Sequence, residues 1–370
     1  MYRGVATVSE SERRSLERFV ASARPGARLV GVRALGADSN VADRTRKGTG
    51  YGAPIRLDIE HQGRVEALVL HTATPNEFGH DRRADRAAEL LLAADTFGLL
   101  PRHARVVDVG AYGNDGGFVS LNDTGEFYLL TTWAEGIPYA QSLREVGLRK
   151  RAEAQDLLKV ERLAAYLGEL HHEALDDRVA YVRSLRDLVG AGEGIFGISD
   201  GYADDVPGAD RARLERLELA CVEARQRLRS KVHRLRRIHG DFHPFNVLFD
   251  DRGELSLLDA SRGSQGDPAD DVTALTVNYL FFALEHEGSW QEGFRPLWQR
   301  FFERYLAATR DGELGAVIAP FFAWRALVLA CPTWYPKLRL ETRERLLGFV
   351  ESLLEGRRFT PELADELFTS

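Results

Sequence analysis

The spacing of the apolar residues changes near residue 134, and this change constrains the fold more than any other feature of the sequence. The segments RLVGVRALG (28–36), APIRLDIEH (53–61) and RVEALVLHTA (64–73) alternate apolar and polar side chains, which is typical of short β-strands. Later segments carry apolar residues at helical spacing instead. We therefore predict two lobes, a β-rich lobe at 1–133 and a mostly helical lobe at 134–370.

One helical segment and two further strand-like runs complete the first lobe. DRRADRAAELLLAADTFG (81–98) has helical spacing and ends in a glycine, which predicts a helix with a C-cap. ARVVDVGAY (104–112) and EFYLLTTW (126–133) are predicted strands. In the second lobe, helical spacing occurs in the segments 149–175, 209–237, 270–287 and 343–356.

The composition fits a large two-lobed protein and narrows its partners. A chain of 370 residues with 44% hydrophobic residues can bury a large core and is too long for one typical domain. Its formal net charge of −7 disfavours a general nucleic-acid binder, which would carry a basic excess. No apolar run of about 18 residues occurs, so we expect neither membrane spanning nor secretion. The two cysteines, Cys221 and Cys331, form no CxxC pattern, which fits a reducing cytoplasm.

The most informative short stretch is HGDFHPFN, residues 239–246, within the helical lobe. Two short apolar runs follow it, VLF and ELSLLD, and the turn sequence DDRG joins them, so a β-hairpin is predicted. The hairpin would place Asp241 and Asn246 before its first strand and Asp259 at the exit of its second. All three side chains can then converge on one cleft.

Phosphoryl transfer needs such a set of groups. Mg²⁺ prefers oxygen ligands and binds through one or two carboxylates together with the phosphates of a nucleotide. A further carboxylate orients the attacking hydroxyl and accepts its proton. In this interpretation Asn246 and Asp259 hold Mg²⁺, and Asp241 is the base.

Two other interpretations of the stretch stay open. His239, Asp241 and His243 could bind a catalytic zinc or iron ion, which would make the protein a metal-dependent hydrolase or oxygenase. The remaining histidines are scattered, however, and no HExxH motif completes such a cage. The stretch could also be a polar turn around a buried histidine, but a turn does not explain why Asn246, Asp259 and the sequence GDPADD follow at these intervals.

The pattern HGDxHxxN, with an aspartate after the hairpin and then GDPADD, resembles the aminoglycoside phosphotransferase and choline kinase superfamily. The resemblance implies an α+β, bilobal protein-kinase-like fold over nearly the whole chain, with a nucleotide-binding first lobe. It also implies that Asp241 is the catalytic base and that Asn246 and Asp259 are the metal ligands. His239 would brace the catalytic segment, and Asp271 would be the structural aspartate at the start of a helix.

The same resemblance implies a small-molecule kinase, a transferase that moves the γ-phosphate of ATP or GTP to a hydroxyl group with the help of Mg²⁺. An aminoglycoside, an aminocyclitol or a sugar is the expected acceptor. The aromatic segments FFAW (321–324) and TWYP (333–336) are the only hint of an acceptor site, since an aromatic box can bind a quaternary ammonium group. Aromatic residues at helical spacing more often belong to the core.

One position departs from the superfamily pattern. His71 stands where the phosphate-binding lysine of the third strand is expected. Glu89 occupies the place of the lysine's glutamate partner, although it also fits a solvated helix face. A neutral imidazole can donate a hydrogen bond to phosphate but supplies no permanent charge. A catalytically inactive nucleotide-binding protein is therefore the rival to an active kinase, and the presence of Asp241, Asn246 and Asp259 in one chain argues against it.

Basic residues elsewhere in the first lobe could supply the missing charge. Arg56 lies on the preceding strand, and Lys47 lies in the glycine-rich loop 36–52. Glycine-rich backbone can approach phosphates closely, and it can equally form a flexible turn. Adenine is expected to bind backbone groups near Thr132 and Ala134, in a segment that resembles the hinge of the superfamily.

Overall fold

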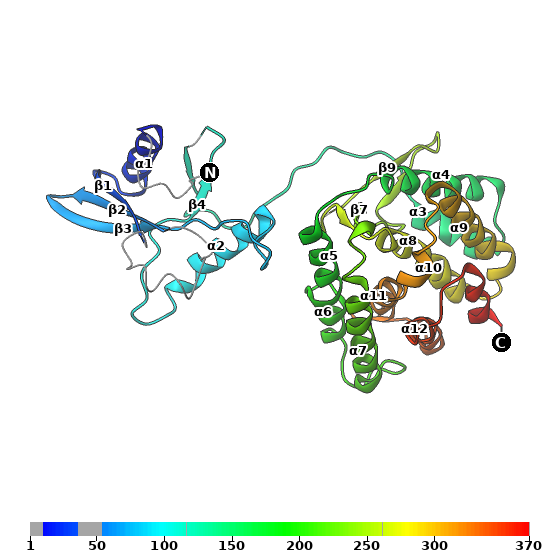
Figure 1. Cartoon of the computed structure of the whole chain (residues 1–370). Helices are drawn as coiled ribbons and strands as arrows, with labels where there is room; N and C mark the ends of the chain where they lie inside the picture. Colours follow the sequence, from blue (N-terminus) through cyan, green and yellow to red (C-terminus); the bar gives the residue numbers. More distant parts are fainter. Residues whose placement is uncertain (1–9, 36–53, 116, 261, 370) are drawn as a thin grey trace. The chain divides into compact units, whose positions relative to one another are not determined.

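The chain divides into two compact units, an N-terminal unit (Met1–Thr131) and a C-terminal unit (Thr132–Ser370). The computed structural model describes residues 10–35, 54–115, 117–260 and 262–369 (Figure 1). Each unit has its own hydrophobic core. A β-rich unit followed by a mostly helical one is the element order of the predicted α+β, protein-kinase-like fold.

A three-stranded antiparallel sheet forms the centre of the N-terminal unit. Its strands are β1 (Arg28–Ala34), β2 (Ile55–His61) and β3 (Arg64–Leu70), in the order β1-β2-β3, and all three lie in the predicted segments. Helix α1 (Glu10–Ala23), which the sequence analysis missed, packs its apolar side against this sheet. The buried core residues are Leu16, Val20, Leu29, Leu57 and Ile59.

The rest of this unit confirms one prediction and corrects two. Helix α2 (Arg83–Phe97) lies in the predicted segment and is followed by Gly98, whose φ of −66° is an ordinary helical value. Of the strand predicted at 104–112, only β4 (Gly110–Tyr112) forms, and it pairs with β5 (Phe118–Ser120). The strand predicted at 126–133 was wrong, because this segment has no strand assignment. A short run of apolar and aromatic residues permits a strand, but a strand forms only where a neighbouring strand supplies hydrogen bonds.

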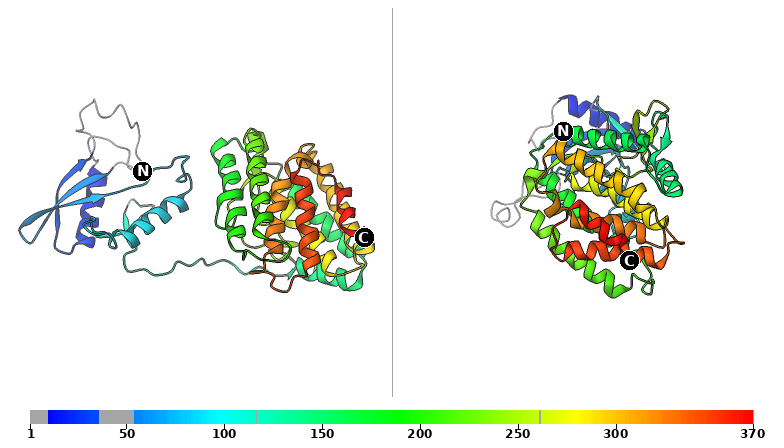
Figure 2. Two further views of the ribbon diagram at one scale, coloured as in Figure 1. Left: turned by 90° about the horizontal axis from the view of Figure 1, so that it is seen from below. Right: turned by 90° about the vertical axis from the view of Figure 1, so that its right-hand side faces the viewer.

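The C-terminal unit is built mainly from α-helices, and α11 (Ala319–Ala330) packs against α6, α7, α8 and α12 (Figures 1 and 2). The other helices are α3 (Tyr139–Arg149), α4 (Ala154–Leu170), α5 (Arg178–Gly190), α6 (Ile195–Asp200), α7 (Arg211–Leu228), α8 (Ala269–Glu285), α9 (Arg295–Thr309), α10 (Leu314–Val317) and α12 (Leu340–Leu354). Short helical turns form η1 (Val232–Arg234), η2 (Trp290–Phe294) and η3 (Pro361–Phe368). Among the described residues, none of the helices combines the length and the apolar character needed to cross a membrane.

The helical segment predicted at 149–175 is interrupted near its start. Helix α3 ends at Arg149, and Lys150 adopts a left-handed conformation with φ of 57°. Helix α4 then begins after Glu153, whose backbone N–H donates to the carboxylate of Asp156 at 2.8 Å. This bond is half of a capping box, so a local start signal overrides the continuous helical spacing of the sequence.

The predicted β-hairpin is present. It consists of β8 (Val247–Phe249) and β9 (Leu255–Leu257), and β6 (Ile137–Pro138) pairs with the outer edge of β8. A second small ladder joins β7 (Arg236–Arg237) to β10 (Gln265–Gly266). The stretch 239–246 therefore connects β7 to β8, so both of its ends are held by strand pairing.

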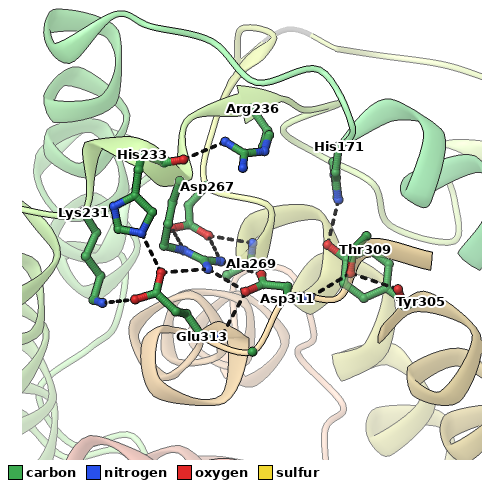
Figure 3. A network of polar contacts seen from close by, with 12 residues as sticks. His171, Lys231, His233, Arg236, Asp267, Ala269, Tyr305, Thr309, Asp311 and Glu313 are labelled. Atoms are coloured by element: carbon green, nitrogen blue, oxygen red, sulfur yellow. Dashed lines mark hydrogen bonds and ion pairs between the residues drawn. The ribbon is translucent and has the colours of Figure 1, made fainter. Parts of the chain in front are cut away.

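A network of ion pairs ties together the segments around η1 (Figure 3). The buried guanidinium of Arg234 donates to both carboxylate oxygens of Asp267, at 2.7 and 2.8 Å, and to both of Asp311, each at 2.8 Å. Glu313 accepts hydrogen bonds from Lys231 Nζ and His233 Nε2, each at 2.6 Å. The network thus joins η1 to the loop before α8 and to the start of α10.

The protonation of Glu313 should influence stability in acid. Hydrogen bonds from Lys231 and then His233 lower the pKa of Glu313 from 4.5 to about 2. A lowered pKa in the folded state gives stability that is present above pH 4.5 and is lost as the pH falls toward 2. We expect Glu313→Gln to flatten the pH dependence of the free energy of unfolding in this range. Urea unfolding at a series of pH values measures it. Glu215→Gln, on an exposed face of α7, should leave the pH dependence unchanged; equal curves for the Glu313 variant and the parent would contradict the prediction.

Candidate functional site

The stretch 239–246, from here on the catalytic loop, makes a sharp turn at Gly240. This glycine has φ of +82°, and a Cβ atom there would lie 2.7 Å from the carbonyl oxygen of Gly263. Only glycine meets both conditions without strain. The position of glycine in the HGD sequence is therefore required by the backbone, and the turn directs the chain from β7 toward Asp241.

A fully buried carboxylate anchors this turn. Asp271, in the first turn of α8, accepts hydrogen bonds from the backbone N–H groups of His239 at 2.7 Å and Gly240 at 2.8 Å. His171 Nε2 lies 3.1 Å from the same carboxylate, and its Nδ1 lies 2.9 Å from the hydroxyl of Tyr305. The contacts give Asp271 a structural role. The sequence analysis missed His171, because nothing in its local sequence indicates a partner so far along the chain.

Asp241 lies close to two arginines and a histidine. Its Oδ1 accepts a hydrogen bond of 2.7 Å from Arg325 Nη1, and its Oδ2 lies 3.6 Å from His243 Nε2 and 4.0 Å from Arg262 Nη2. Burial opposes the charge on Asp241, but the attraction of Arg325 and Arg262 outweighs burial and lowers the pKa of the carboxyl group below its ordinary value. Asp241 is therefore ionised at neutral pH, as a proton acceptor must be.

The second carboxylate bound by Arg325 behaves differently. Asp270 Oδ1 accepts a hydrogen bond of 2.6 Å from Arg325 Nη2, yet burial raises the pKa of Asp270 to about 6. Burial also lowers the pKa of His243, so that its imidazole is neutral at physiological pH. Arg325 and Arg262 were both missed by the sequence analysis, although Arg262 follows Asp259 closely in the sequence.

Asn246 and Asp259 are placed next to each other by a backbone bond. The N–H of Leu258 donates to the carbonyl oxygen of Asn246 at 2.9 Å, and Asp259 follows with φ of 54°, a left-handed value that aspartate tolerates. Asn246 Nδ2 donates to the backbone carbonyl of Asp241 at 3.1 Å. Within the described part of the chain, no donor binds Asn246 Oδ1 or the exposed carboxylate of Asp259. Unused oxygens of these two kinds fit a Mg²⁺ ion, which prefers oxygen ligands.

The two loop histidines are occupied by local hydrogen bonds. Nδ1 of His239 accepts the backbone N–H of Asp241 at 3.2 Å, and Nδ1 of His243 accepts that of Phe245 at 3.2 Å. In the segments that the structure describes, no three His, Cys, Asp or Glu side chains are grouped as a metal site requires. His239 thus braces the loop through its ring.

The predicted phosphate-binding residues of the N-terminal unit have other partners. Glu89 lies 3.2 Å from His80 Nε2, so the histidine beside it is His80 and not His71, which follows the end of β3. Arg56 Nε donates to Asp58 at 2.7 Å, so part of its charge is already neutralised. Lys47 lies outside the described residues. Thr132 and Ala134 lie in the segment that precedes β6.

The aromatic segment 321–324 belongs to the core. Phe321, Phe322 and Trp324 are all buried, and the Trp324 indole Nε1 donates to the carbonyl of Glu193 at 2.7 Å. The guanidinium carbons of Arg325 and Arg262 lie 3.8 and 4.6 Å from the centre of a Trp324 ring. Because protein cations already cover this indole, it is not the wall of a quaternary-ammonium box. In the segment 333–336, Trp334 is exposed and Tyr335 packs edge-on against Phe281.

Comparisons with known proteins identify the family. Residues 58–321, most of the chain, match the family described as the phosphotransferase enzyme family (APH), so the chain belongs to this family and the predicted membership is confirmed. No match was found among the curated proteins.

Several solved structures are similar to this chain at low sequence identity. Choline kinase LicA from Streptococcus pneumoniae is 15% identical with a TM-score of 0.37, over 92% of this chain and 98% of that one. Aminoglycoside phosphotransferase APH(3'')-Id from Streptomyces rimosus is 18% identical with a TM-score of 0.30, over 52% and 67%. An ethanolamine kinase from Plasmodium vivax is 11% identical with a TM-score of 0.33, over 86% and 78%. The family membership rests on the sequence match alone.

Replacement of Asp271 should destabilise the C-terminal unit. Asp271→Asn keeps only one acceptor oxygen for two backbone N–H groups and turns an amide N–H toward the other. A buried donor without a partner costs about 1–3 kcal/mol, and more is lost where the acceptor was charged, so we expect a decrease of about 2–3 kcal/mol in the free energy of unfolding. Urea denaturation measures it. Asp251→Asn, in the exposed turn of the β8–β9 hairpin, is the matched control; a similar small effect for both variants would contradict the anchoring role.

Proposed function

We propose that the protein is a small-molecule kinase that transfers the γ-phosphate of ATP or GTP to a hydroxyl group. The observation that carries this proposal is the geometry of the catalytic loop. The ionised carboxylate of Asp241 lies beside Asn246, and the Leu258–Asn246 backbone bond brings Asp259 to the same place. This arrangement supports the roles of a base for Asp241 and of oxygen ligands for Asn246 and Asp259, and membership of the phosphotransferase enzyme family supports the same chemistry.

The residues of the site would have different roles in phosphoryl transfer. Catalysis of this reaction is mostly positioning and electrostatic stabilisation, since the transferred group carries charge on its oxygens. Asp241 orients the acceptor hydroxyl and accepts its proton. Asn246 and Asp259 would hold Mg²⁺, which supplies positive charge next to the phosphates when it is bound. Asp271 and His239 keep the loop in shape, so that these groups need no rearrangement when substrates arrive.

For the acceptor, we propose an aminoglycoside, an aminocyclitol or a sugar. These compounds share hydroxyl groups that Asp241 can orient. A choline-like acceptor held in an aromatic box has less support, because Arg325 and Arg262 cover Trp324. We also propose that the enzyme is cytoplasmic and binds neither nucleic acid nor membrane. The acidic net charge supports the absence of nucleic-acid binding, and two cysteines without a CxxC pattern fit a reducing compartment.

Turnover of nucleotide with a panel of hydroxylated compounds tests the proposed function. We expect Asp241→Asn to lower turnover by about 10²–10⁴-fold, the range for removal of a general base, while nucleotide binding stays close to that of the parent. Asp259→Ala should instead weaken the binding of Mg²⁺-ATP, because it removes a metal ligand. Calorimetric titration and steady-state rates separate the two effects. Turnover within a factor of a few in the Asp241 variant would refute the role of base.

A catalytically inactive nucleotide-binding protein is the second candidate, and specific observations favour it. His71 stands in place of the expected lysine, Glu89 lies beside His80, and Arg56 is paired with Asp58. Positive charge for the phosphates is therefore scarce among the described residues predicted to bind nucleotide in the N-terminal unit. An inactive protein would bind Mg²⁺-ATP and turn over no compound in the panel.

The variant His71→Lys tests whether position 71 faces the phosphates. Hydrogen bonds to charged groups contribute about 1.5–3 kcal/mol, against about 0.5–1.5 kcal/mol for neutral ones, so we expect Mg²⁺-ATP to bind up to about tenfold more tightly. Calorimetric titration measures the affinity. His61→Lys makes the same change at the opposite end of the β2–β3 hairpin and should not alter it. Equal affinities for parent and His71→Lys would place His71 away from the phosphates.

A further inference from the structure

We propose that Arg325 is a positioning residue for Asp241: it binds one oxygen of the carboxylate and leaves the other for the acceptor hydroxyl. This inference rests on the proposed function, in which Asp241 accepts the proton. Arg325 lies in α11, 84 residues away from Asp241 in the sequence. It would act on the acceptor hydroxyl only through Asp241.

The two oxygens of Asp241 have unequal surroundings. Oδ1 accepts the 2.7 Å hydrogen bond from Arg325 Nη1. The nearest described groups to Oδ2 are more distant: Asn246 Nδ2 at 3.5 Å, His243 Nε2 at 3.6 Å and Arg262 Nη2 at 4.0 Å. Contacts of this length are weak or are not hydrogen bonds. Oδ2 therefore keeps a free lone pair, and it is the oxygen that can accept the proton of a hydroxyl.

Arg325 is itself held on several sides. Its Nη2 donates to Asp270 Oδ1 at 2.6 Å and to the backbone carbonyl of Gly240 at 3.1 Å. Its guanidinium carbon lies over Trp324, 3.8 Å from the centre of a ring. A planar guanidinium can make these contacts together, whereas a lysine ammonium offers a point charge without the fork. The orientation of Asp241 is thus set by α8, α11 and the turn at Gly240 at once.

A second buried arginine in the same unit serves as an internal comparison. Arg234 also joins two aspartates, Asp267 and Asp311, and it is as buried as Arg325. Neither of its partners belongs to the catalytic loop. Loss of Arg234 and loss of Arg325 should therefore cost stability in the same way, and only the loss of Arg325 should change catalysis beyond that.

The first experiment compares Arg325→Lys, Arg234→Lys and Asp241→Asn. The probe is the formation of ADP from Mg²⁺-ATP, with water as the acceptor and with the best acceptor from the panel, well below the unfolding temperature. Misplacement of a catalytic group by about 1 Å can cost about 10²-fold, so we expect kcat of Arg325→Lys to fall by about that factor with KM for Mg²⁺-ATP nearly unchanged. Arg234→Lys should keep the kcat of the parent.

We also expect millimolar guanidinium ion to restore part of the kcat of Arg325→Ala and none of the loss in Asp241→Asn.

The second experiment needs no turnover. Arg325→Met leaves the Asp241 carboxylate buried without its partner, and an unpaired buried charge is strongly destabilising. Asp241→Asn should therefore raise the thermal midpoint in the Arg325→Met background and lower it in the parent. In the Arg234→Met background it should lower the midpoint as in the parent. If the effect of Asp241→Asn on the thermal midpoint changes sign only in the Arg325→Met background, Arg325 and Asp241 are directly coupled.

The outcomes separate this inference from the proposed function. If Asp241→Asn keeps the turnover of the parent, or if the parent forms no ADP with any acceptor, the proposed function fails and the positioning role fails with it. If Asp241→Asn loses turnover while Arg325→Lys keeps the parental kcat, only the positioning role is overturned. The last outcome has three parts: kcat falls in both Arg325→Lys and Arg234→Lys, guanidinium restores no activity to Arg325→Ala, and Asp241→Asn lowers the thermal midpoint in the Arg325→Met background as it does in the parent. This outcome would show that Arg325 is merely structural.

Discussion

The hydrogen bonds that the carboxylate of Asp271 accepts from the backbone of His239 and Gly240 hold the site together. A buried carboxylate is costly unless its oxygens are satisfied, and here two backbone N–H groups and His171 satisfy them. The same bonds fix the left-handed turn at Gly240, from which the chain reaches Asp241. The requirement to neutralise one buried charge thus determines the path of the catalytic loop.

The same arrangement of buried charges occurs at two places in the C-terminal unit. A buried arginine lies between two aspartates, Arg325 between Asp241 and Asp270, and Arg234 between Asp267 and Asp311. The bidentate geometry of arginine suits this arrangement, since its donors satisfy two carboxylates in one plane. The first cluster keeps Asp241 ionised within a buried setting, and the second joins segments that carry no site residue.

The elements that depend on residue spacing within a few positions were predicted from the sequence. Those that depend on contacts with distant segments were not. The strands at β2 and β3 and the hairpin β8–β9 follow from alternation and turn residues within a few positions. The strand-like segment 126–133 forms no strand, because pairing requires a neighbouring strand that the short apolar run does not specify. Helix α1 went unpredicted, although it supplies two of the five buried residues of the N-terminal core, Leu16 and Val20.

By itself, the sequence determined the class of fold, the family and the chemical groups of the catalytic loop, because periodicity and the HGDxHxxN pattern act over short distances along the chain. Only the tertiary structure decided which charges surround those groups. Arg325 reaches Asp241 across 84 residues and His171 reaches Asp271 across 100. The packing of α11 and of the end of α4 against the loop creates these pairs, and no local spacing in the sequence encodes them. An arginine or a histidine on a helix has the same sequence pattern whether it faces solvent or a buried carboxylate.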